Sequence, residues 1–142
     1  MSEQPLEIQP LIKAAEAAFQ HAVAPSSGFR VGAALQTQKG ALFTGCNIES
    51  PVYLGICAER VALFKALSEG FREFLALAIV CEEGVACSPC GTCRQLLWEF
   101  APGLKIVLVD EQGAAQCHAI EDLLPKVFER GGRNPFKSNG LR

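Results

Sequence analysis

The sequence predicts an α/β fold in which helices alternate along the chain with buried strands. Two apolar runs, Phe74–Cys81 and Lys105–Val109, are typical of strands that are covered on both faces. Apolar residues at three- and four-residue steps surround these runs, as in helices that bury one face. We therefore expect a three-layer α-β-α domain with a central mixed five-stranded sheet. The 142 residues suffice for one such domain, to which we assign residues 1–142, with 130–142 as a loose C-terminal extension.

The first half of the chain predicts a helix followed by a hairpin. Residues 7–23 place apolar side chains at helical spacing, and the turn residues at 25–28 end that helix. Phe29–Gln36 alternates in the manner of a strand, Lys39-Gly40 marks a turn, and Leu42–Ile48 is the returning strand. The hairpin supplies two strands of the sheet.

The second half predicts helices and strands in alternation. A helix over Cys57–Leu67 has apolar residues at helical spacing and stops before Gly70. Ser88-Pro89 signals a helix start, with serine as the cap and proline in the first turn, and Pro102-Gly103 breaks that helix. The remaining elements are a strand at Lys105–Val109, a turn at 110–113, a strand at Ala114–Ile120 and a short helix at Ile120–Pro125.

Charge and hydropathy weigh against several classes of function. Thirteen basic and fifteen acidic residues give a net charge of −2, whereas nonspecific binding to nucleic acids or membrane surfaces usually needs a basic excess. A membrane span needs about 20 apolar residues, and the longest apolar run, Phe74–Cys81, is far shorter. The opening residues lack the basic region and apolar run of a secretory signal. We expect a cytoplasmic protein without a nucleic-acid or membrane partner.

The seven cysteines do not suggest a disulfide framework, because their number is odd and no export signal is present. Cys46, Cys81 and Cys117 lie within or beside apolar stretches, and we interpret them as small core residues. Cys87 is left without an assigned role. Cys90-Gly-Thr-Cys93 by itself has three interpretations: half of a zinc site, a redox pair, or chance.

Two predicted helix starts carry residues that suit a metal site. Cys90 and Cys93 are three positions apart on one helix and so share a face, and Cys57 begins the other helix. Three thiolates can bind one zinc ion and leave its fourth position open, as in catalytic zinc sites. The positive ends of both helix dipoles, together with Arg60, would offset the excess negative charge of the sulfurs. Glu59 is the carboxylate beside the predicted metal and can carry protons in catalysis.

Several motifs occur in one order along most of the chain. Two of them are Cys57-Ala-Glu-Arg60 and Ser88-Pro-Cys-Gly-Thr-Cys-Arg-Gln95. The others are Phe29-Arg-Val-Gly-Ala-Ala34, Thr44-Gly-Cys-Asn-Ile-Glu49 and Glu121-Asp-Leu-Leu-Pro125. This set resembles the small, all-cysteine cytidine deaminases. The resemblance implies a cytidine deaminase-like fold and a zinc-dependent hydrolase of pyrimidine salvage, which converts cytidine and deoxycytidine to uridine and deoxyuridine plus ammonia.

The resemblance also implies a role for each site residue. Cys57, Cys90 and Cys93 hold one zinc ion per subunit, Glu59 shuttles protons, and Arg60 supports the zinc ligands. The substrate-binding positions are Phe29 in the nucleoside pocket, Asn47 and Glu49 at the ribose hydroxyls, the backbone at Ala58 beside the ring, and Phe128 at the base bound by a neighbouring subunit. Family members of this size are homotetramers with shared active sites. The expected partners are therefore a small nucleoside and further copies of the chain.

Other functions stay open on the sequence alone. Blasticidin S deaminases share the zinc motifs and have a shorter loop before Cys57, as this chain does, but they lack the sugar clamp that Asn47 and Glu49 would form. Nucleic-acid base deaminases usually have histidine as the first ligand, and neither histidine here lies in such a motif. A noncatalytic zinc-stabilised domain would not need Glu59, and a thiol oxidoreductase would not need Cys57.

Overall fold

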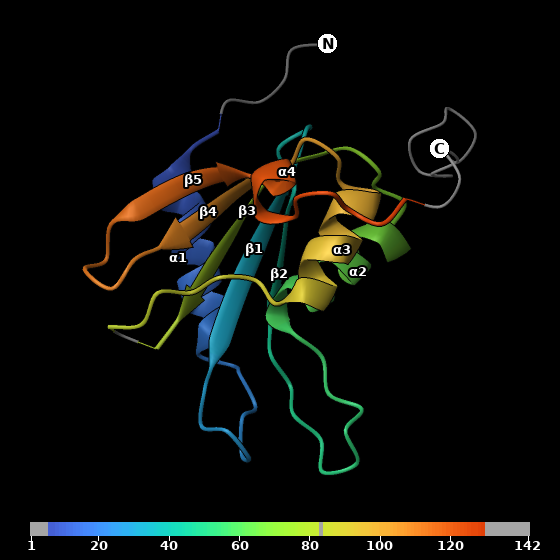
Figure 1. The fold of residues 1–142 in the computed structure, drawn as a ribbon. Helices are drawn as coiled ribbons and strands as arrows, with labels where there is room; N and C mark the ends of the chain where they lie inside the picture. The colour runs from blue at the N-terminus through green and yellow to red at the C-terminus, as the bar shows by residue number, and fades with distance from the viewer. Residues whose placement is uncertain (1–5, 83, 130–142) are drawn as a thin grey trace.

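Five strands form one sheet in the order β2-β1-β3-β4-β5 (Figure 1). The computed structural model describes residues 6–82 and 84–129, so the extension expected at 130–142 lies outside the described residues. The strands are β1 (Val31–Thr37), β2 (Leu42–Cys46), β3 (Phe74–Cys81), β4 (Lys105–Val109) and β5 (Ala115–Ala119). β3 and β4 are parallel because a helix crosses over between them, and the other neighbouring pairs are antiparallel. The prediction of a mixed five-stranded sheet is confirmed.

Helices cover both faces of this sheet. α1 (Ile8–Phe19) packs against one face, whereas α2 (Ala58–Ser68) and α3 (Gly91–Phe100) lie side by side over the other (Figure 1). A short helix, α4 (Ile120–Leu123), follows β5 and contacts α3. The arrangement confirms the three-layer α-β-α architecture.

The core has two parts because alternate residues of the central strands face opposite layers. The side under α2 and α3 takes Ala33, Leu35, Leu77, Ile79 and Ile106 from the strands. The side under α1 takes Ala34, Ala76, Ala78, Val80 and Val107. β3 is buried on both faces, as its continuous apolar run predicts.

Two glycines allow a helix backbone to approach each face of the sheet closely. A Cβ atom at Gly32 of β1 would lie 2.6 Å from the backbone nitrogen of Phe19 in α1. A Cβ atom at Gly45 of β2 would lie 2.7 Å from the backbone nitrogen of Ala62 in α2, and closer still to the carbonyl oxygen of Ala58. A larger residue at either position must push the helix away from the strand. Gly45 therefore sets how closely the first turn of α2 approaches the sheet.

Some element boundaries differ from the expected ones. The first helix ends at Phe19 rather than at residue 23, because Val23 turns away to pair its backbone with Asn47 and Glu49. β1 begins at residue 31 rather than 29, and β2 ends at residue 46 rather than 48. At that end of the hairpin the backbone N–H of Asn47 donates to the Val31 carbonyl, and its side-chain amide bonds the Val31 N–H and the Phe29 carbonyl.

The prediction of a serine cap for α3 is wrong. Cys90, not Ser88, is the N-terminal cap residue, and its backbone is extended. The hydroxyl of Ser88 is engaged elsewhere, because it accepts a hydrogen bond from Arg94. The last helix is also shorter than expected, since it ends at Leu123 rather than at Pro125.

The cysteines interpreted as core residues are less buried than expected. Cys46 and Cys81 are half-buried, and Cys117 is exposed, so the core interpretation is wrong for Cys117. Its strand, β5, lies at the edge of the sheet and is mostly exposed. The cysteine left without a role, Cys87, is buried, and burial raises the pKa of its thiol. All seven cysteines are free thiols.

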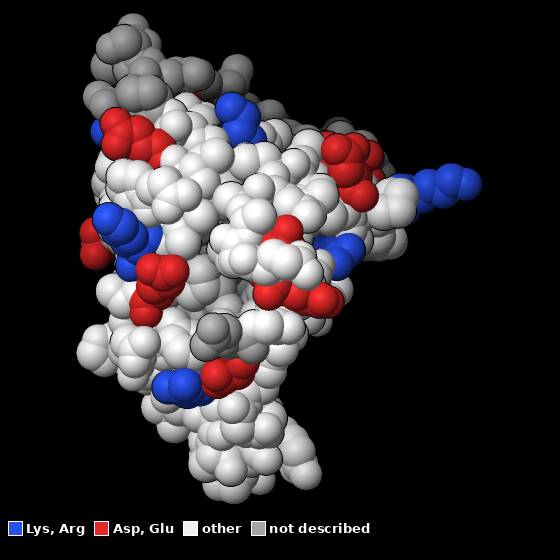
Figure 2. All heavy atoms as spheres, turned by 90° about the vertical axis from the view of Figure 1, so that its left-hand side faces the viewer, with Lys and Arg blue, Asp and Glu red and all other residues white. Residues whose placement is uncertain are grey.

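Charged side chains of both signs are interspersed on one face of the molecule. On the face shown in Figure 2, Lys and Arg side chains lie among Asp and Glu side chains and do not form a basic stripe. Among the described residues, no helix has both the length and the hydropathy that crossing a bilayer requires.

Candidate metal centre

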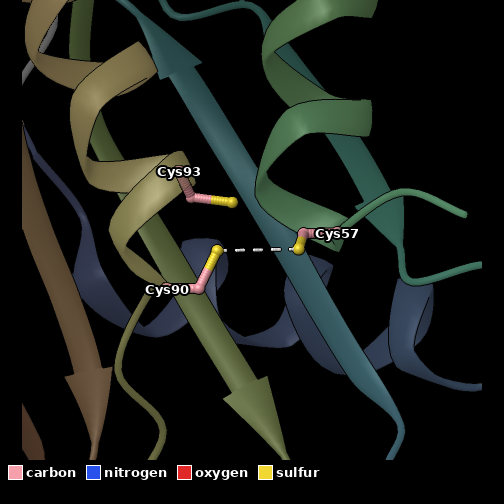
Figure 3. Close-up of side chains that lie close together, drawn as sticks. All are labelled: Cys57, Cys90 and Cys93. Atoms are coloured by element: carbon pink, nitrogen blue, oxygen red, sulfur yellow. Dashed lines mark hydrogen bonds between the residues drawn. The ribbon is translucent and has the colours of Figure 1, made fainter.

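The starts of α2 and α3 bring three cysteines together on one side of the sheet. Cys57 caps the N-terminus of α2, Cys90 holds the same position in α3, and Cys93 lies in the first turn of α3. Figure 3 shows their side chains pointing into the space between the two helix starts. Unpaired N–H groups at a helix N-terminus give this space a positive potential that suits thiolates. The two motifs predicted to act together therefore meet in the fold.

The three sulfurs are spaced for one tetrahedral ion. The Sγ atoms of Cys57 and Cys90 are 3.8 Å apart, and all three sulfurs lie within 4.8 Å of one another. Two zinc–sulfur bonds of about 2.3 Å at the tetrahedral angle separate their sulfurs by about 3.8 Å. Three cysteine ligands also leave one of the four zinc positions open. The residues present fit the zinc ion that the sequence predicts.

Hydrogen bonds and charge favour a thiolate at Cys57. The thiol of Cys93 and the guanidinium of Arg60 lower the pKa of Cys57 to about 5, and Arg60 Nη2 lies 3.3 Å from the Cys57 sulfur. The same sulfur contact raises the pKa of Cys93, which keeps its proton beside an ionised neighbour. Because metals bind thiolates, a bound cation would displace that proton as well.

Arg60 is held at the sulfurs by this interaction. Its contact with the Cys57 sulfur raises the pKa of the guanidinium, which stays charged. Its Nε is buried and has no hydrogen-bond partner among the described residues. An arginine in this place reduces the negative charge that three thiolates would present to a single divalent ion.

Glu59 is a buried carboxyl group at the same site. It is 5% exposed, and its Oε2 accepts a hydrogen bond of 3.2 Å from the sulfur of Cys93. Burial raises the pKa of Glu59 above its ordinary value. A carboxyl group fixed beside a metal site and shielded from water is suited to proton transfer.

Asn47 and Glu49, the residues predicted to bind the ribose, hydrogen-bond to the segment that leads into β1. Asn47 accepts a hydrogen bond of 2.8 Å from the Val31 backbone N–H and donates one of 2.8 Å to the Phe29 carbonyl. Glu49 Oε1 accepts hydrogen bonds of 2.9 and 3.1 Å from the backbone N–H groups of residues 26–27. The Ser27 hydroxyl and these N–H groups lower the pKa of Glu49, which is therefore a carboxylate.

The remaining candidate residues lie at the surface, with one exception. Phe29 is 39% and Phe128 75% exposed, and the Phe128 carbonyl accepts a hydrogen bond of 3.3 Å from Gln95 in α3. Tyr53, which the sequence analysis does not name as a site residue, lies in the loop that precedes α2, is 96% exposed and has a positive φ. Ala58 is fully buried in the core under α2, so its side chain is not a surface contact.

Comparisons with known proteins agree with this site. Residues 6–109 match the family model of the cytidine and deoxycytidylate deaminase zinc-binding region. The crystal structure of a cytidine deaminase from Burkholderia pseudomallei is 47% identical, with a TM-score of 0.82, and the match covers 87% of this chain and 100% of that one. A cytidine deaminase from Halalkalibacterium halodurans is 44% identical over 125 residues, 87% of this chain and 95% of the relative. A blasticidin-S deaminase from Bacillus cereus is 32% identical over 111 residues, 70% of this chain and 77% of that protein.

The fold and the three-cysteine site define a zinc-dependent hydrolase of the deaminase class. The chain belongs to the cytidine and deoxycytidylate deaminase family, as its ordered motifs predict. Its cofactor is zinc, for which the three cysteines supply a suitable donor set.

The sequence does not predict the contacts of one residue of this region, Arg94. Its guanidinium hydrogen-bonds to Pro89 and Ser88, immediately before Cys90. The sequence feature that could have identified Arg94 is its position next to Cys93, within the motif Ser88–Gln95 that resembles the family.

Proposed function

We propose that the chain hydrolyses cytidine and deoxycytidine to uridine and deoxyuridine with release of ammonia. The observation that carries this proposal is the buried carboxyl group of Glu59, 3.2 Å from a sulfur of the three-cysteine site. Relatives named cytidine deaminase, at 44% and 47% identity over most of the chain, support the same substrate class.

In this mechanism the cysteines hold the metal and Glu59 moves the protons. Cys57, Cys90 and Cys93 would hold zinc, which when bound supplies a positive charge that activates water at neutral pH. Glu59 takes a proton from the attacking water and delivers a proton to ring nitrogen N3 while the water oxygen bonds to C4. Glu59 then carries the remaining hydroxyl proton to the amino group, the bond between C4 and that nitrogen breaks, and ammonia leaves. The oxygen stays on C4, so the product is the uracil nucleoside.

The sugar and base would be bound by the residues around the start of β1. The carboxylate of Glu49 and the amide of Asn47 suit a pair of neighbouring hydroxyl groups, since together they offer acceptors and donors. Phe29 supplies an apolar wall for the nucleoside. Any contact at Ala58 would be made by its backbone, because its side chain is buried. In this scheme Arg60 supports the zinc ligands and does not touch the nucleoside.

Exposed apolar residues support a homotetramer in which subunits share active sites. In the loop before α2, the side chains of Val52, Tyr53 and Leu54 are 66%, 96% and 82% exposed. Contiguous exposed apolar side chains of this kind mark protein interfaces. Phe128, 75% exposed, would cover the base bound by a neighbouring subunit. Light scattering of the purified protein tests this assembly, and a monomer would contradict it.

The cell compartment and metabolic role belong to the same proposal. Seven free thiols suit the reducing environment of the cytoplasm, where disulfides rarely persist. Release of uridine from cytidine places the enzyme in pyrimidine salvage.

The deciding experiment measures ultraviolet absorbance of zinc-loaded protein with cytidine, deoxycytidine and blasticidin S in parallel. Loss of the cytosine band with release of ammonia from either nucleoside is the expected result. Turnover of blasticidin S alone would replace the proposed substrate class with that of the Bacillus cereus relative. An inactive protein with zinc bound would overturn the proposal in favour of a noncatalytic zinc-stabilised domain. Protein treated with a chelator is the control in each assay.

A further inference from the structure

We propose that Arg94 is a positioning residue for the metal centre: it fixes the segment that places Cys90 at the zinc. Arg94 lies in the first turn of α3, and its backbone N–H donates a hydrogen bond of 3.0 Å to the Cys90 carbonyl. Its side chain reaches two parts of the chain that are separate from α3. The proposal concerns retention of the metal and does not depend on which nucleoside is the substrate.

The guanidinium of Arg94 donates three hydrogen bonds in different directions. Nε donates to the carbonyl of Pro89 at 2.8 Å, and Nη2 donates to the hydroxyl of Ser88 at 2.6 Å. Nη1 donates to the carbonyl of Leu123, at the end of α4, at 2.7 Å. A planar charged fork makes such bonds short and directional, so the two residues before Cys90 are tied to α4.

Apart from the packing of the buried Pro89 ring, the segment before Cys90 has few other contacts that hold it in place. Pro89 has no N–H group to donate, and no backbone-to-backbone hydrogen bond between described residues involves residues 88–89. The carbonyl of Pro89 and the hydroxyl of Ser88 instead meet the same guanidinium. The hydrogen bonding that fixes the backbone path into Cys90 therefore comes from Arg94.

Cys90 is also the metal ligand that packing constrains least. Cys93 is fully buried and Cys57 is half-buried, whereas Cys90 is exposed. Neighbouring side chains thus hold the first two sulfurs, but the position of the Cys90 sulfur follows the position of its backbone. An arginine that fixes this backbone keeps the third sulfur within reach of the ion without touching it.

The first test compares zinc release from two methionine variants of the holoenzyme. Arg94→Met keeps the apolar length of the side chain and removes the three bonds. Arg72→Met is the matched control, because Arg72 also bonds backbone carbonyls, those of Leu67 and Phe71, at the far end of α2. Transfer of zinc to a colorimetric chelator should be about tenfold faster for Arg94→Met, the lower end of the range for outer residues of metal sites. Arg72→Met should release zinc at the wild-type rate even if its melting temperature falls.

Equal acceleration in the two variants, or none in Arg94→Met, would overturn the proposal, since either result assigns Arg94 an ordinary role in stability. Two milder variants keep the test valid if Arg94→Met does not fold. Arg94→Lys retains the charge but not the three-way fork, and Ser88→Ala removes one acceptor. Both should release zinc at rates between those of the wild type and Arg94→Met, and wild-type rates in both would contradict the proposal.

The double variant shows whether Arg94 acts through Ser88. If it does, Ser88→Ala should accelerate zinc release in the wild-type protein and add nothing in the Arg94→Met background, because the partner is already absent. Where Arg94→Met does not fold, Arg94→Lys serves as the background, and the effect of Ser88→Ala should shrink there. Full additivity of the two changes would show that they act independently and would reject this route.

Discussion

The two faces of the sheet differ in what they bury. Under α1, side chains such as Leu11 and Ala15 form an apolar cluster with the strands. Under α2 and α3 the apolar cluster is larger, and the buried acidic residue of the described chain, Glu59, lies on this side with the buried Cys93. The middles of the helices thus pack on both faces, whereas the three clustered cysteines and Glu59 lie at two helix starts on one face. Substitutions on the two faces should therefore separate stability from catalysis.

Glu59→Gln should have the largest effect on the reaction and little effect on folding. The amide keeps the size of the carboxyl group but cannot accept and return a proton, so kcat should fall about 10²–10⁴-fold. Zinc content and melting temperature should stay close to those of the wild type. Ammonia release and metal analysis on the same preparation check this, and full activity of the variant would rule out the proposed proton shuttle.

Cys90→Ala should lose both metal and stability. Removing one of three sulfurs leaves too few protein ligands for tight zinc binding. The lost stabilisation should be about 3–4 kcal/mol when zinc is present at about 100–1,000 times its dissociation constant. A chelator should lower the melting temperature of the wild type and leave that of Cys90→Ala unchanged. A chelator-induced shift of equal size in the variant would show that the zinc is bound elsewhere.

Leu11→Ala on the opposite face should lower stability alone. Leu11 is 1% exposed in the cluster under α1. Its truncation leaves a cavity, which should lower the free energy of unfolding by about 2–5 kcal/mol. Urea denaturation should show this loss, whereas KM and zinc content at a temperature well below melting should match the wild type. A raised KM in the folded variant would mean that the two faces are coupled.

The smallest expected effect is that of Glu82→Gln, at the edge of the α1 face. Arg30 Nε lies 2.9 Å from Glu82 Oε1, and the Arg30 guanidinium stacks 4.5 Å from the centre of the Phe19 ring. Arg30 lowers the pKa of Glu82, so the pair stabilises the fold above the unfolded-state pKa, and this contribution is lost as pH falls through the folded-state pKa. The side chains of Arg30 and Glu82 are 43% and 32% exposed, so water screens the pair and the effect should be smaller than that of Leu11→Ala.

Urea denaturation of Glu82→Gln and wild type, with chelator present throughout, checks the sign of this pH dependence. The variant should be less stable near neutral pH, and the difference should shrink as the solution is acidified below about pH 4. A difference that grows on acidification would contradict the assignment.

The sequence predicts the features that depend on short-range patterns. The continuous apolar run of β3 identifies a strand buried on both faces, and the spacing of Cys90 and Cys93 places two sulfurs on one side of a helix start. The meeting of these sulfurs with Cys57 follows because both helices begin at the same end of the sheet. The first two of these inferences use only the period of a strand or a helix, whereas the third depends on where two helices begin.

The features that the sequence misses depend on distant partners. Ser88 has the residue type of a helix cap, but its hydroxyl accepts a hydrogen bond from Arg94. Val23 has a helical neighbourhood, but its backbone pairs with the segment after β2. Cys117 is exposed because β5 lies at the edge of the sheet, and strand order is not written in the local pattern.

The absent side chain at Gly45 has a consequence for redesign of the metal centre. The first turn of α2 rests directly on this glycine, and that turn begins at Cys57. Because Gly45 has no side chain, β2 lets the start of α2 approach closely, and this approach helps to set the distance between the sulfur of Cys57 and those of the two cysteines of α3. A design for a larger ion could therefore keep all three cysteines and add a side chain at this strand position, beginning with Gly45→Ala.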